Sequence, residues 1–184
     1  SDMSGSDFQV LGPAGLRLRP RVPLVGEFNV ANYLCAIAMA ASAGLDPEAV
    51  ASGLPKGQGV PGRLESIDVG QEFMALVDYA HKPDALEVAL TELRSMVPGQ
   101  IILVLGAGGD RDTGKRAVMG EVAARLSDHF VITDDNPRTE APASIRDQLK
   151  QGADRVEPSV RAVVMEIPDR AEAIREAVAR ARAG

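Results

Sequence analysis

The chain has 184 residues, 45% of them hydrophobic and 25% charged, which is the composition of a globular protein with room for one domain or one domain and part of another. The formal net charge of −6 argues against a general nucleic-acid surface, and no apolar stretch approaches the ~20 residues that cross a membrane. The single cysteine, Cys35, excludes an internal disulfide and indicates a reducing compartment, which we expect to be the cytoplasm.

The first part of the chain predicts small elements followed by a linker. Residues 1–7 are expected to be a tag remnant and a disordered start, followed by short strands at 8–11 and 16–18. An Ala-rich helix is predicted over 30–43, with Cys35 buried in it, and Asp46-Pro47 opens a second helix as N-cap and first helical residue.

A stretch rich in glycine and proline, residues 55–62, separates this part from the rest of the chain. It reads as a linker. We therefore predict a domain boundary there, with one unit over 8–60 and a second over 61–184.

Beyond the linker, strand patterns alternate with helix patterns. The predicted strands are 73–79, 101–105, 130–133 and 162–167, and the predicted helices are 83–97, 115–126, 142–152 and 169–182. This alternation predicts an α/β fold, a Rossmann-like doubly wound and mainly parallel sheet. Ligands bind at the carboxyl ends of such strands, so three loops, 78–83, 106–115 and 133–138, are expected to converge. No strand follows the last helix, so this domain is expected to be truncated.

The first loop reads Asp78-Tyr79-Ala80-His81-Lys82-Pro83. A carboxylate at a strand end can accept hydrogen bonds from ribose hydroxyls, and an imidazole nearby can bind phosphate or lie against a purine. Alternatively, Asp78 caps the following helix and His81 is a solvated turn residue. The motif is too short to decide alone.

The second loop, 106–114, is rich in glycines that permit close backbone approach to a ligand, but it lacks the Gly-Lys-Ser/Thr ending of a P-loop, and its glycines miss the spacing of a dinucleotide motif. Arg111 is its informative residue, because a guanidinium can bind a carboxylate bidentately. The flanking Asp110 and Asp112 could instead hold Arg111 in a structural salt bridge. Lys115-Arg116 lies in the first turn of the next helix, where the dipole disfavours cations, which weakly suggests an anionic ligand.

The third loop contains Asn136, Pro137 and Arg138. Asn136 offers a donor and an acceptor, and Arg138 offers a second guanidinium. An ordinary helix-capping turn explains these residues about equally well when they are taken alone. Two arginines on neighbouring loops, however, suit an amino acid with more than one carboxylate.

Five segments in order resemble the Mur ligase family, over about residues 24–182, and the resemblance is strongest to the diaminopimelate-adding branch of that family. The matching segments are Gly26-Glu27-Phe28-Asn29-Val30-Ala31-Asn32, Val60-Pro61-Gly62-Arg63-Leu64-Glu65, Asp78-Tyr79-Ala80-His81-Lys82-Pro83, Gly108-Gly109-Asp110-Arg111-Asp112 with Gly114-Lys115-Arg116, and Asp135-Asn136-Pro137-Arg138.

The resemblance implies a role for each of several residues. Asn32 and His81 would flank the adenine of ATP, Asp78 would hold its ribose, and Arg63 would contact the nucleotide or its phosphates. In the same way, three residues would bind the carboxylate end of meso-diaminopimelate, namely Arg111, Asn136 and Arg138.

The family reaction uses ATP and Mg²⁺ to phosphorylate the carboxylate of UDP-N-acetylmuramoyl-L-alanyl-D-glutamate, which the amine of diaminopimelate then attacks. This chain contains no Gly-x-x-Gly-Lys-Thr segment, no recognisable magnesium ligands and no final Gly-Lys-Gly-His-Glu segment. We therefore expect residues 8–60 to be the tail of the central ATPase domain, with no catalytic residue and no metal ligand in this chain. Its partners would be the small-molecule substrates and the rest of the ligase, not nucleic acid or a membrane.

Two alternatives stay open. A folylpolyglutamate synthetase-like ligase carries a related Asp-x-x-His-Asn-Pro segment, although Lys82 and the Asp135–Arg138 form favour the cell-wall branch. A non-catalytic binding module with the same fold is the other alternative.

Overall fold

The computed structural model describes residues 5–12, 16–22, 26–56 and 60–183, and these fall into two compact units. The first unit contains the described residues up to Val69 together with Met74–Tyr79. The second contains Gly70–Phe73 and the described residues from Ala80 onward. Residues 61–69 thus pack with the first unit, although the sequence places them after the predicted boundary. Residues 57–59 of the predicted linker and 1–4 of the predicted tag remnant lie outside the described residues.

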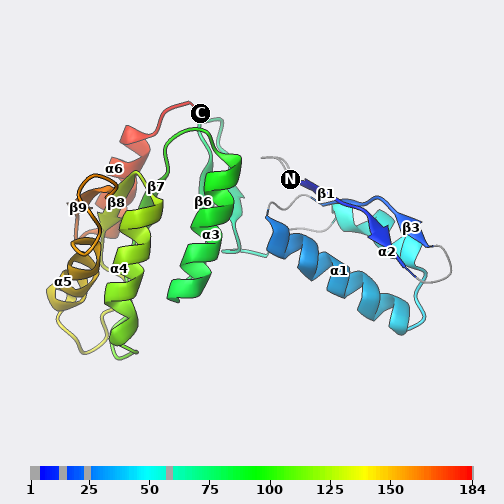
Figure 1. Ribbon diagram of the computed structural model, residues 1–184, viewed down its shortest axis with the longest axis horizontal. Coiled ribbons are helices and arrows are strands. Elements are labelled where there is room, and N and C mark those ends of the chain that lie inside the picture. The colour runs from blue at the N-terminus through cyan, green and yellow to red at the C-terminus, as the bar shows by residue number, and fades with distance from the viewer. Residues whose placement is uncertain (1–4, 13–15, 23–25, 57–59, 184) are drawn as a thin grey trace. The chain divides into compact units, whose positions relative to one another are not determined.

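The first unit combines short antiparallel strand pairs with two helices (Figure 1). Its elements are β1 (Ser6–Asp7), β2 (Val10–Leu11), β3 (Arg17–Leu18), β4 (Arg21–Val22), α1 (Glu27–Ser42), α2 (Pro47–Gly53), a 3₁₀ turn (Leu54–Lys56), β5 (Glu65–Ile67) and β6 (Ala75–Val77). The predicted strands at 8–11 and 16–18 are confirmed as the pair β2–β3, and β1, inside the predicted disordered start, pairs with β4.

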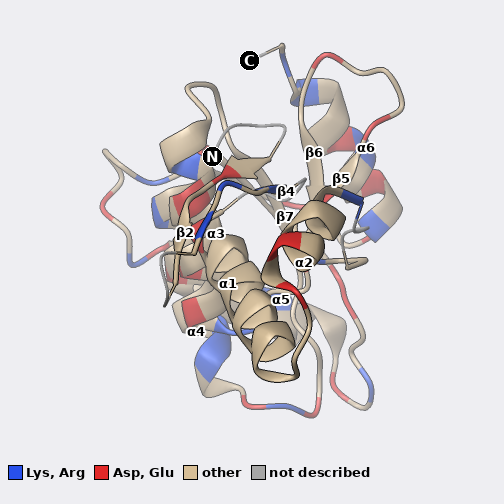
Figure 2. Ribbon diagram, turned by 90° about the vertical axis from the view of Figure 1, so that its right-hand side faces the viewer, with Lys and Arg blue, Asp and Glu red and all other residues tan. Residues whose placement is uncertain are grey.

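Helix α1 begins one turn before its predicted start and carries no charged side chain after Glu27, so its ribbon in Figure 2 is uncoloured beyond the first turn. Ile37 packs with Leu18 and Ala51 in a small core. Cys35 is exposed, so the prediction that it is buried is wrong: the described neighbours cover only the Ile37 face of the helix. No helix in the described part of the chain is long and apolar enough to cross a membrane.

Asp46 caps α2 as predicted, since its carboxylate accepts the Glu48 N–H at 3.1 Å. The strand predicted at 73–79 also exists, as β6, but its assignment to the parallel sheet is wrong. It pairs antiparallel with β5, an element that the sequence did not predict, in a separate two-stranded sheet.

The second unit has the predicted α/β architecture. Its elements are α3 (Pro83–Met96), β7 (Ile102–Leu105), α4 (Gly114–Leu126), β8 (His129–Ile132), α5 (Pro142–Ala153), β9 (Val163–Glu166) and α6 (Arg170–Arg180). Strands β7, β8 and β9 form a parallel sheet in that order. Each observed element begins and ends within about two residues of its prediction, and the Rossmann-like parallel arrangement is confirmed for these three strands.

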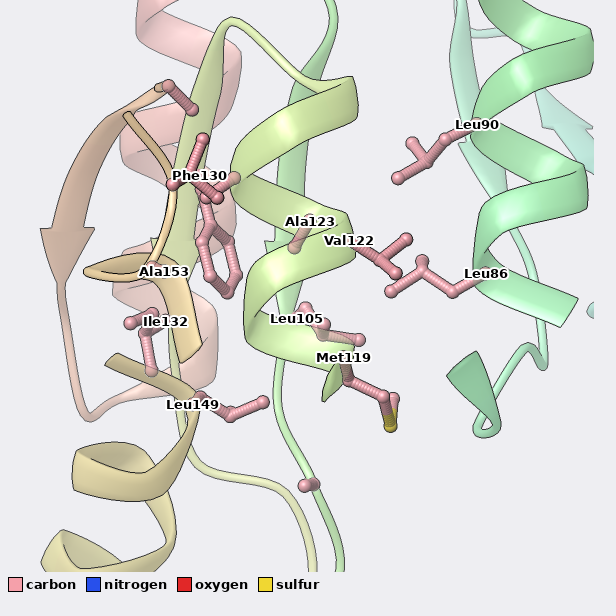
Figure 3. Close-up of a cluster of buried hydrophobic side chains, with 14 of the residues drawn as sticks. Leu86, Leu90, Leu105, Met119, Val122, Ala123, Phe130, Ile132, Leu149 and Ala153 are labelled. Carbon is pink, nitrogen blue, oxygen red and sulfur yellow. The ribbon is translucent and has the colours of Figure 1, made fainter. Parts of the chain in front are cut away.

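Helices cover both faces of this sheet (Figure 1). Phe130 and Ile132 of β8 belong to the buried apolar cluster that also contains Ala123 of α4 and Leu149 of α5, while Val122 on the other side of α4 points towards Leu86 of α3 (Figure 3). Val131, between them, is also fully buried and faces the opposite side by strand alternation, where α6 packs on β7 and β8. Burial on both faces explains why β8 reads as a continuous apolar run.

Helices α4 and α5 cross at unusually short range because each has a glycine at the contact. A Cβ atom at Gly120 would lie 1.9 Å from the carbonyl oxygen of Leu149, and one at Gly152 would lie 1.8 Å from that of Ala117. The backbones therefore touch directly. This contact fixes α5 against the first turns of α4, next to the loops that follow β7 and β8.

Candidate functional site

The loops that follow β7 and β8, residues 106–113 and 133–141, lie at the carboxyl edge of the parallel sheet and bind each other. The Gly109 N–H donates to the carbonyl oxygen of Asn136 at 2.8 Å. The Asp110 carboxylate accepts the backbone N–H of Thr139 at 3.2 Å and its hydroxyl at 2.7 Å. The two loops therefore form one body at the position where doubly wound folds bind ligands.

The glycines of the loop that follows β7 are explained by this loop–loop contact. A Cβ atom at Gly109 would lie 1.9 Å from the carbonyl oxygen of Pro137, and one at Gly106 would lie 2.7 Å from that of Thr133. The close approach inferred from the sequence is real, but in the structure it is made to the neighbouring loop.

Arg138 joins the two loops with both its backbone and its side chain. Its φ of 50° is left-handed, and its backbone N–H donates to the Asn136 side-chain oxygen at 3.3 Å. Its Nη1 donates to the carbonyl oxygen of Gly109 at 2.6 Å. A non-glycine residue in this conformation costs about 1–2 kcal/mol, so the surrounding contacts must hold it in place. Arg138 as a whole residue is exposed, and its Nη1 bond is the side-chain hydrogen bond that ties it to the neighbouring loop.

Arg111 is exposed and makes no hydrogen bond or ion pair with any residue that the structure describes. The alternative salt bridges do not form. Asp110 binds Thr139, and Asp112 accepts the Gly114 N–H at 2.9 Å. The unpaired cation of Arg111 therefore lies two residues from Gly109, to which Arg138 is bonded.

Asn136 completes the predicted set of three. It is exposed, and its backbone and side-chain oxygens accept hydrogen bonds from Gly109 and Arg138 respectively. The structure thus brings the loops that carry Arg111, Asn136 and Arg138 into direct contact.

The two cations in the first turn of α4 have partners inside the protein. Lys115 Nζ donates to the carbonyl oxygen of His81 at 2.7 Å. Arg116 is fully buried and binds Glu140 through both terminal nitrogens, at 2.7 and 2.8 Å. The anionic ligand that the sequence suggested for these cations is therefore not needed to explain them.

Glu140 is a member of the site that the sequence analysis missed. The Arg116 guanidinium, with the Asp110 N–H as a second donor, lowers the pKa of the Glu140 carboxyl from 4.5 to about 2. The same hydrogen bonds raise the pKa of Arg116. Both groups are therefore charged at every physiological pH. The position of Glu140 between Thr139 and a helix start gave no signal of this pairing.

A second missed network lies where β8 and β9 end. Arg146 of α5, nearly buried, donates from Nε to Glu166 at 2.7 Å and pairs through Nη1 with Asp134. Hydrogen bonds from Glu166 and Asp134 raise the pKa of Arg146. This network connects the start of the loop that follows β8 to α5 and β9.

Of the four predicted nucleotide-binding residues, Asn32, Arg63 and Asp78 belong to the first unit and His81 to the second. Asn32 is exposed on α1. The Asp78 carboxylate accepts the N–H of Leu64 at 2.9 Å, so it holds the turn that carries Arg63. It does not cap α3, whose N-cap residue is Lys82.

The Arg63 guanidinium lies 5.7 Å from the centre of the Tyr79 ring, in the range of a cation–π contact. Two exposed residues of opposite charge, Arg63 and Asp78, therefore lie on neighbouring segments of the first unit that are joined by the Leu64–Asp78 hydrogen bond.

Metal binding and cavities give no further candidate near these loops. Among the described residues, no group of three or more His, Cys, Asp or Glu side chains could hold a metal ion. A cavity of about 370 Å³ lies beside β9, lined by residues that include Lys150, Asp154 and Arg161. None of the predicted site residues lines it.

The model of the family described as "Mur ligase, glutamate ligase domain" matches residues 62–184. A protein of Streptomyces coelicolor named UDP-N-acetylmuramoyl-L-alanyl-D-glutamate–2,6-diaminopimelate ligase is 52% identical over 97% of this chain and 35% of its own length. A protein of Corynebacterium glutamicum with the same name is 47% identical over 100% of this chain and 36% of its own length. The chain therefore spans about a third of the length of these relatives.

Solved structures agree with the fold. One described as the structure of a UDP-N-acetylmuramoyl-L-alanyl-D-glutamate–2,6-diaminopimelate ligase is 39% identical, covers 100% of this chain and 36% of its own, and superimposes with a TM-score of 0.67. A Mycobacterium tuberculosis folylpolyglutamate synthase complexed with ADP superimposes with a TM-score of 0.73 over 96% of this chain and 38% of its own, at 24% identity. The second likeness shows a shared fold alone.

Proposed function

The chain belongs to the Mur ligase family, and from this we propose that it is the amino-acid-binding part of an ATP-dependent ligase of peptidoglycan precursor synthesis. The ligase adds meso-diaminopimelate to UDP-N-acetylmuramoyl-L-alanyl-D-glutamate. The names of relatives at 52% and 47% identity support this choice of substrates. The remaining two thirds of such a protein supply the rest of the active site, and the reaction takes place in the cytoplasm.

One observation carries the proposal: Arg111, an exposed arginine that has no partner among the residues described by the structure, lies on a loop that is hydrogen-bonded to the loop of Arg138. Guanidinium groups bind carboxylates bidentately, and the pair is stronger when both partners are charged. Diaminopimelate has an amino acid group at each end. While one amine reacts, the carboxylate at the other end binds Arg111 and Arg138, and Asn136 binds a polar group beside it.

For the nucleotide, we assign Asn32 and His81 to the adenine, Asp78 to the ribose and Arg63 to the nucleotide or its phosphates. The turn that holds Asp78 and Arg63 close together fits this assignment, since it offers an acceptor for hydroxyls beside a cation for phosphate. ATP supplies the phosphoryl group that activates the acceptor carboxylate, and Mg²⁺ is held by residues outside this chain.

The proposal is tested with the complete protein that contains this chain. ADP formation is measured with UDP-N-acetylmuramoyl-L-alanyl-D-glutamate and either meso-diaminopimelate, lysine or no amino acid. We expect ADP release that depends on diaminopimelate and is far slower with lysine, because lysine lacks the second carboxylate. Equal rates with both amino acids would remove the carboxylate-binding role of the loops.

The same assay addresses the two alternatives. A folylpolyglutamate synthetase-like ligase would release ADP with a folate and glutamate, and a non-catalytic module would release none with any substrate. The first alternative is supported by the shared fold and a related Asp-x-x-His segment, from which Lys82 departs, and no feature of the described residues favours the second.

A further inference from the structure

The buried guanidinium of Arg116 connects elements that the chain separates by up to 40 residues. Its Nη2 donates to the carbonyl oxygen of Gly108, in the loop that follows β7, at 3.0 Å and to Glu140 Oε1 at 2.8 Å. Its Nη1 donates to Glu140 Oε2 at 2.7 Å and to the side-chain oxygen of Gln148 on α5 at 3.1 Å. One side chain of α4 therefore holds together α5 and the two loops that follow β7 and β8.

Glu140 closes this network from the other side. While both of its oxygens accept bonds from Arg116, Oε1 also accepts the backbone N–H of Asp110 at 2.6 Å. Asp110 has a left-handed φ of 51° and uses its carboxylate to hold Thr139, the residue before Glu140. The backbone of the residue next to Arg111 is thus fixed by a carboxylate two residues from Arg138.

A buried ion pair is a poor source of stability, because the cost of removing two charges from water offsets most of their attraction. It does impose a geometry, since a buried guanidinium must keep its partners to avoid an unpaired charge. Of the Glu140 side chain, 27% is exposed to solvent, whereas that of Arg116 is fully buried. A substitution of Glu140 therefore removes a charge from the partly exposed side of the pair. Changes there should act on the loops more than on the core.

We propose that Arg116 and Glu140 are positioning residues that hold the two loops at the spacing at which Arg111 and Arg138 recognise the second carboxylate of diaminopimelate. This inference rests on the proposed function for its substrate. Neither residue touches the amino acid. Their contribution is to the selection of diaminopimelate over lysine, because a displacement of about 1 Å in a clamp of this kind can cost up to about 100-fold in activity.

The test replaces Glu140 by glutamine in the complete protein. Glutamine has the same shape, but it replaces one of the two acceptor oxygens by an NH₂ group, which cannot accept the hydrogen bond from Arg116, and it leaves the buried guanidinium without its counter-charge. We expect E140Q to raise the KM for diaminopimelate about tenfold and to lower the preference for diaminopimelate over lysine by a similar factor. The KM values for ATP and the UDP-dipeptide should change less than about twofold. R116K, which keeps the charge but loses the planar fork, should act in the same direction.

Glu87→Gln provides a matched control in the same unit. Glu87 on α3 accepts a hydrogen bond from Arg125 on α4 at 2.9 Å, and both side chains are nearly half exposed. E87Q therefore makes the same substitution in another arginine–glutamate pair that involves α4, one that is exposed to solvent and lies away from the loops. It should leave all three KM values unchanged.

Hydrogen exchange tests whether the pair holds the loops in place, independently of which amino acid is the substrate. In E140Q, the Gly109 and Asp110 amides should exchange faster than in the wild type, while amides of β7 and β8 keep their protection. Unchanged exchange at those two amides, or an unchanged diaminopimelate-to-lysine preference, overturns the inference. If all KM values rise together and the β8 amides also lose protection, the pair is only structural and the inference is equally overturned. If the wild-type protein does not select diaminopimelate, the proposed function fails. Exchange at Gly109 and Asp110 then still decides whether the pair holds the loops.

Discussion

Arg111 and Arg138 differ in how much of their hydrogen-bonding capacity the protein itself uses. Arg138 donates a hydrogen bond from Nη1 to the Gly109 carbonyl oxygen and has a left-handed backbone conformation, whereas Arg111 has no partner among the described residues. A ligand carboxylate therefore gains a cation from Arg111 without displacing an internal contact. Arg138 serves both the ligand and the loop.

This difference predicts separable effects of two substitutions in the complete protein. Arg111→Ala should raise the KM for diaminopimelate about 10- to 100-fold, the value of about 1.5–3 kcal/mol for a lost charged hydrogen bond, without lowering Tm. Arg138→Ala should raise the KM by a similar factor and also lower Tm, because the Gly109 carbonyl loses its donor. Steady-state kinetics and thermal unfolding of the two variants test this. A destabilised R111A, or an R138A with wild-type kinetics, would contradict the assignment.

The low pKa of Glu140 predicts how its contribution depends on pH. Because the folded pKa, about 2, lies below the ordinary value of 4.5, the pairing contributes its full stability above about pH 5 and loses it as pH falls towards 2. The difference in Tm between the wild type and E140Q should therefore be constant from pH 5 to 8 and shrink below pH 4.5. A carboxyl titration of Glu140 by NMR with a midpoint near 4.5 would show that the ion pair does not form.

Sequence patterns were sufficient for residues whose partners are set by topology. Arg111, Asn136 and Arg138 were predicted to lie together because two buried strands of a parallel sheet place their following loops at one edge. Glu140 and Arg116 could not be predicted to pair, since their contact depends on how two loops pack. The same limit applies to the glycines, whose close neighbour is a loop and not a ligand.

At the scale of elements, the strands of the parallel sheet were predictable because burial on both faces produces continuous apolar runs such as Phe130–Ile132. Strand β5 was missed because Glu65-Ser66-Ile67 is short and has no such run. Once β5 is present, β6 pairs with it and not with β7. Pairing partners of short, partly exposed strands are weakly determined by their own sequence.

The crossing of α4 and α5 predicts that Gly120→Ala is destabilising. The added Cβ would lie 1.9 Å from the Leu149 carbonyl, so the helices must separate, at a cost of about 1–3 kcal/mol that exceeds the helix propensity gained. Gly53→Ala is the control, because nothing lies within 4 Å of its added Cβ at the end of α2. Urea unfolding should show a loss for G120A and little change or a small gain for G53A. Equal stabilities of G120A and the wild type would mean that the helices do not touch there.

For the whole molecule, the relevant fact is that the chain spans about a third of its relatives' length. Helix α1 exposes large apolar side chains in this chain, with Met39 66% and Leu34 38% exposed. The sequence also contains no segment with the Gly-Lys-Ser/Thr ending of a P-loop. Both observations fit a chain whose activity depends on further parts of the protein.

If activity depends on further parts of the protein, residues 1–184 alone should not catalyse the ligase reaction. Incubated with ATP, Mg²⁺, UDP-N-acetylmuramoyl-L-alanyl-D-glutamate and meso-diaminopimelate, the isolated chain should form no ADP above background, because its sequence lacks the complete Gly-x-x-x-x-Gly-Lys-Ser/Thr motif of a P-loop. A coupled ADP assay, run beside the complete protein, measures this. Release of ADP that requires both substrates would show that the isolated chain is itself an enzyme.

The claim that two loops of the second unit bind the acidic end of an amino acid is tested most directly by calorimetric titration of the complete protein. Meso-diaminopimelate and lysine are titrated in turn into the wild type and R111A, with ATP analogue and UDP-dipeptide present. We predict binding of diaminopimelate at least about tenfold tighter than lysine for the wild type, and loss of most of this difference in R111A. Equal affinities for the two amino acids in the wild type, or a difference that survives in R111A, would show that these loops do not bind the second carboxylate.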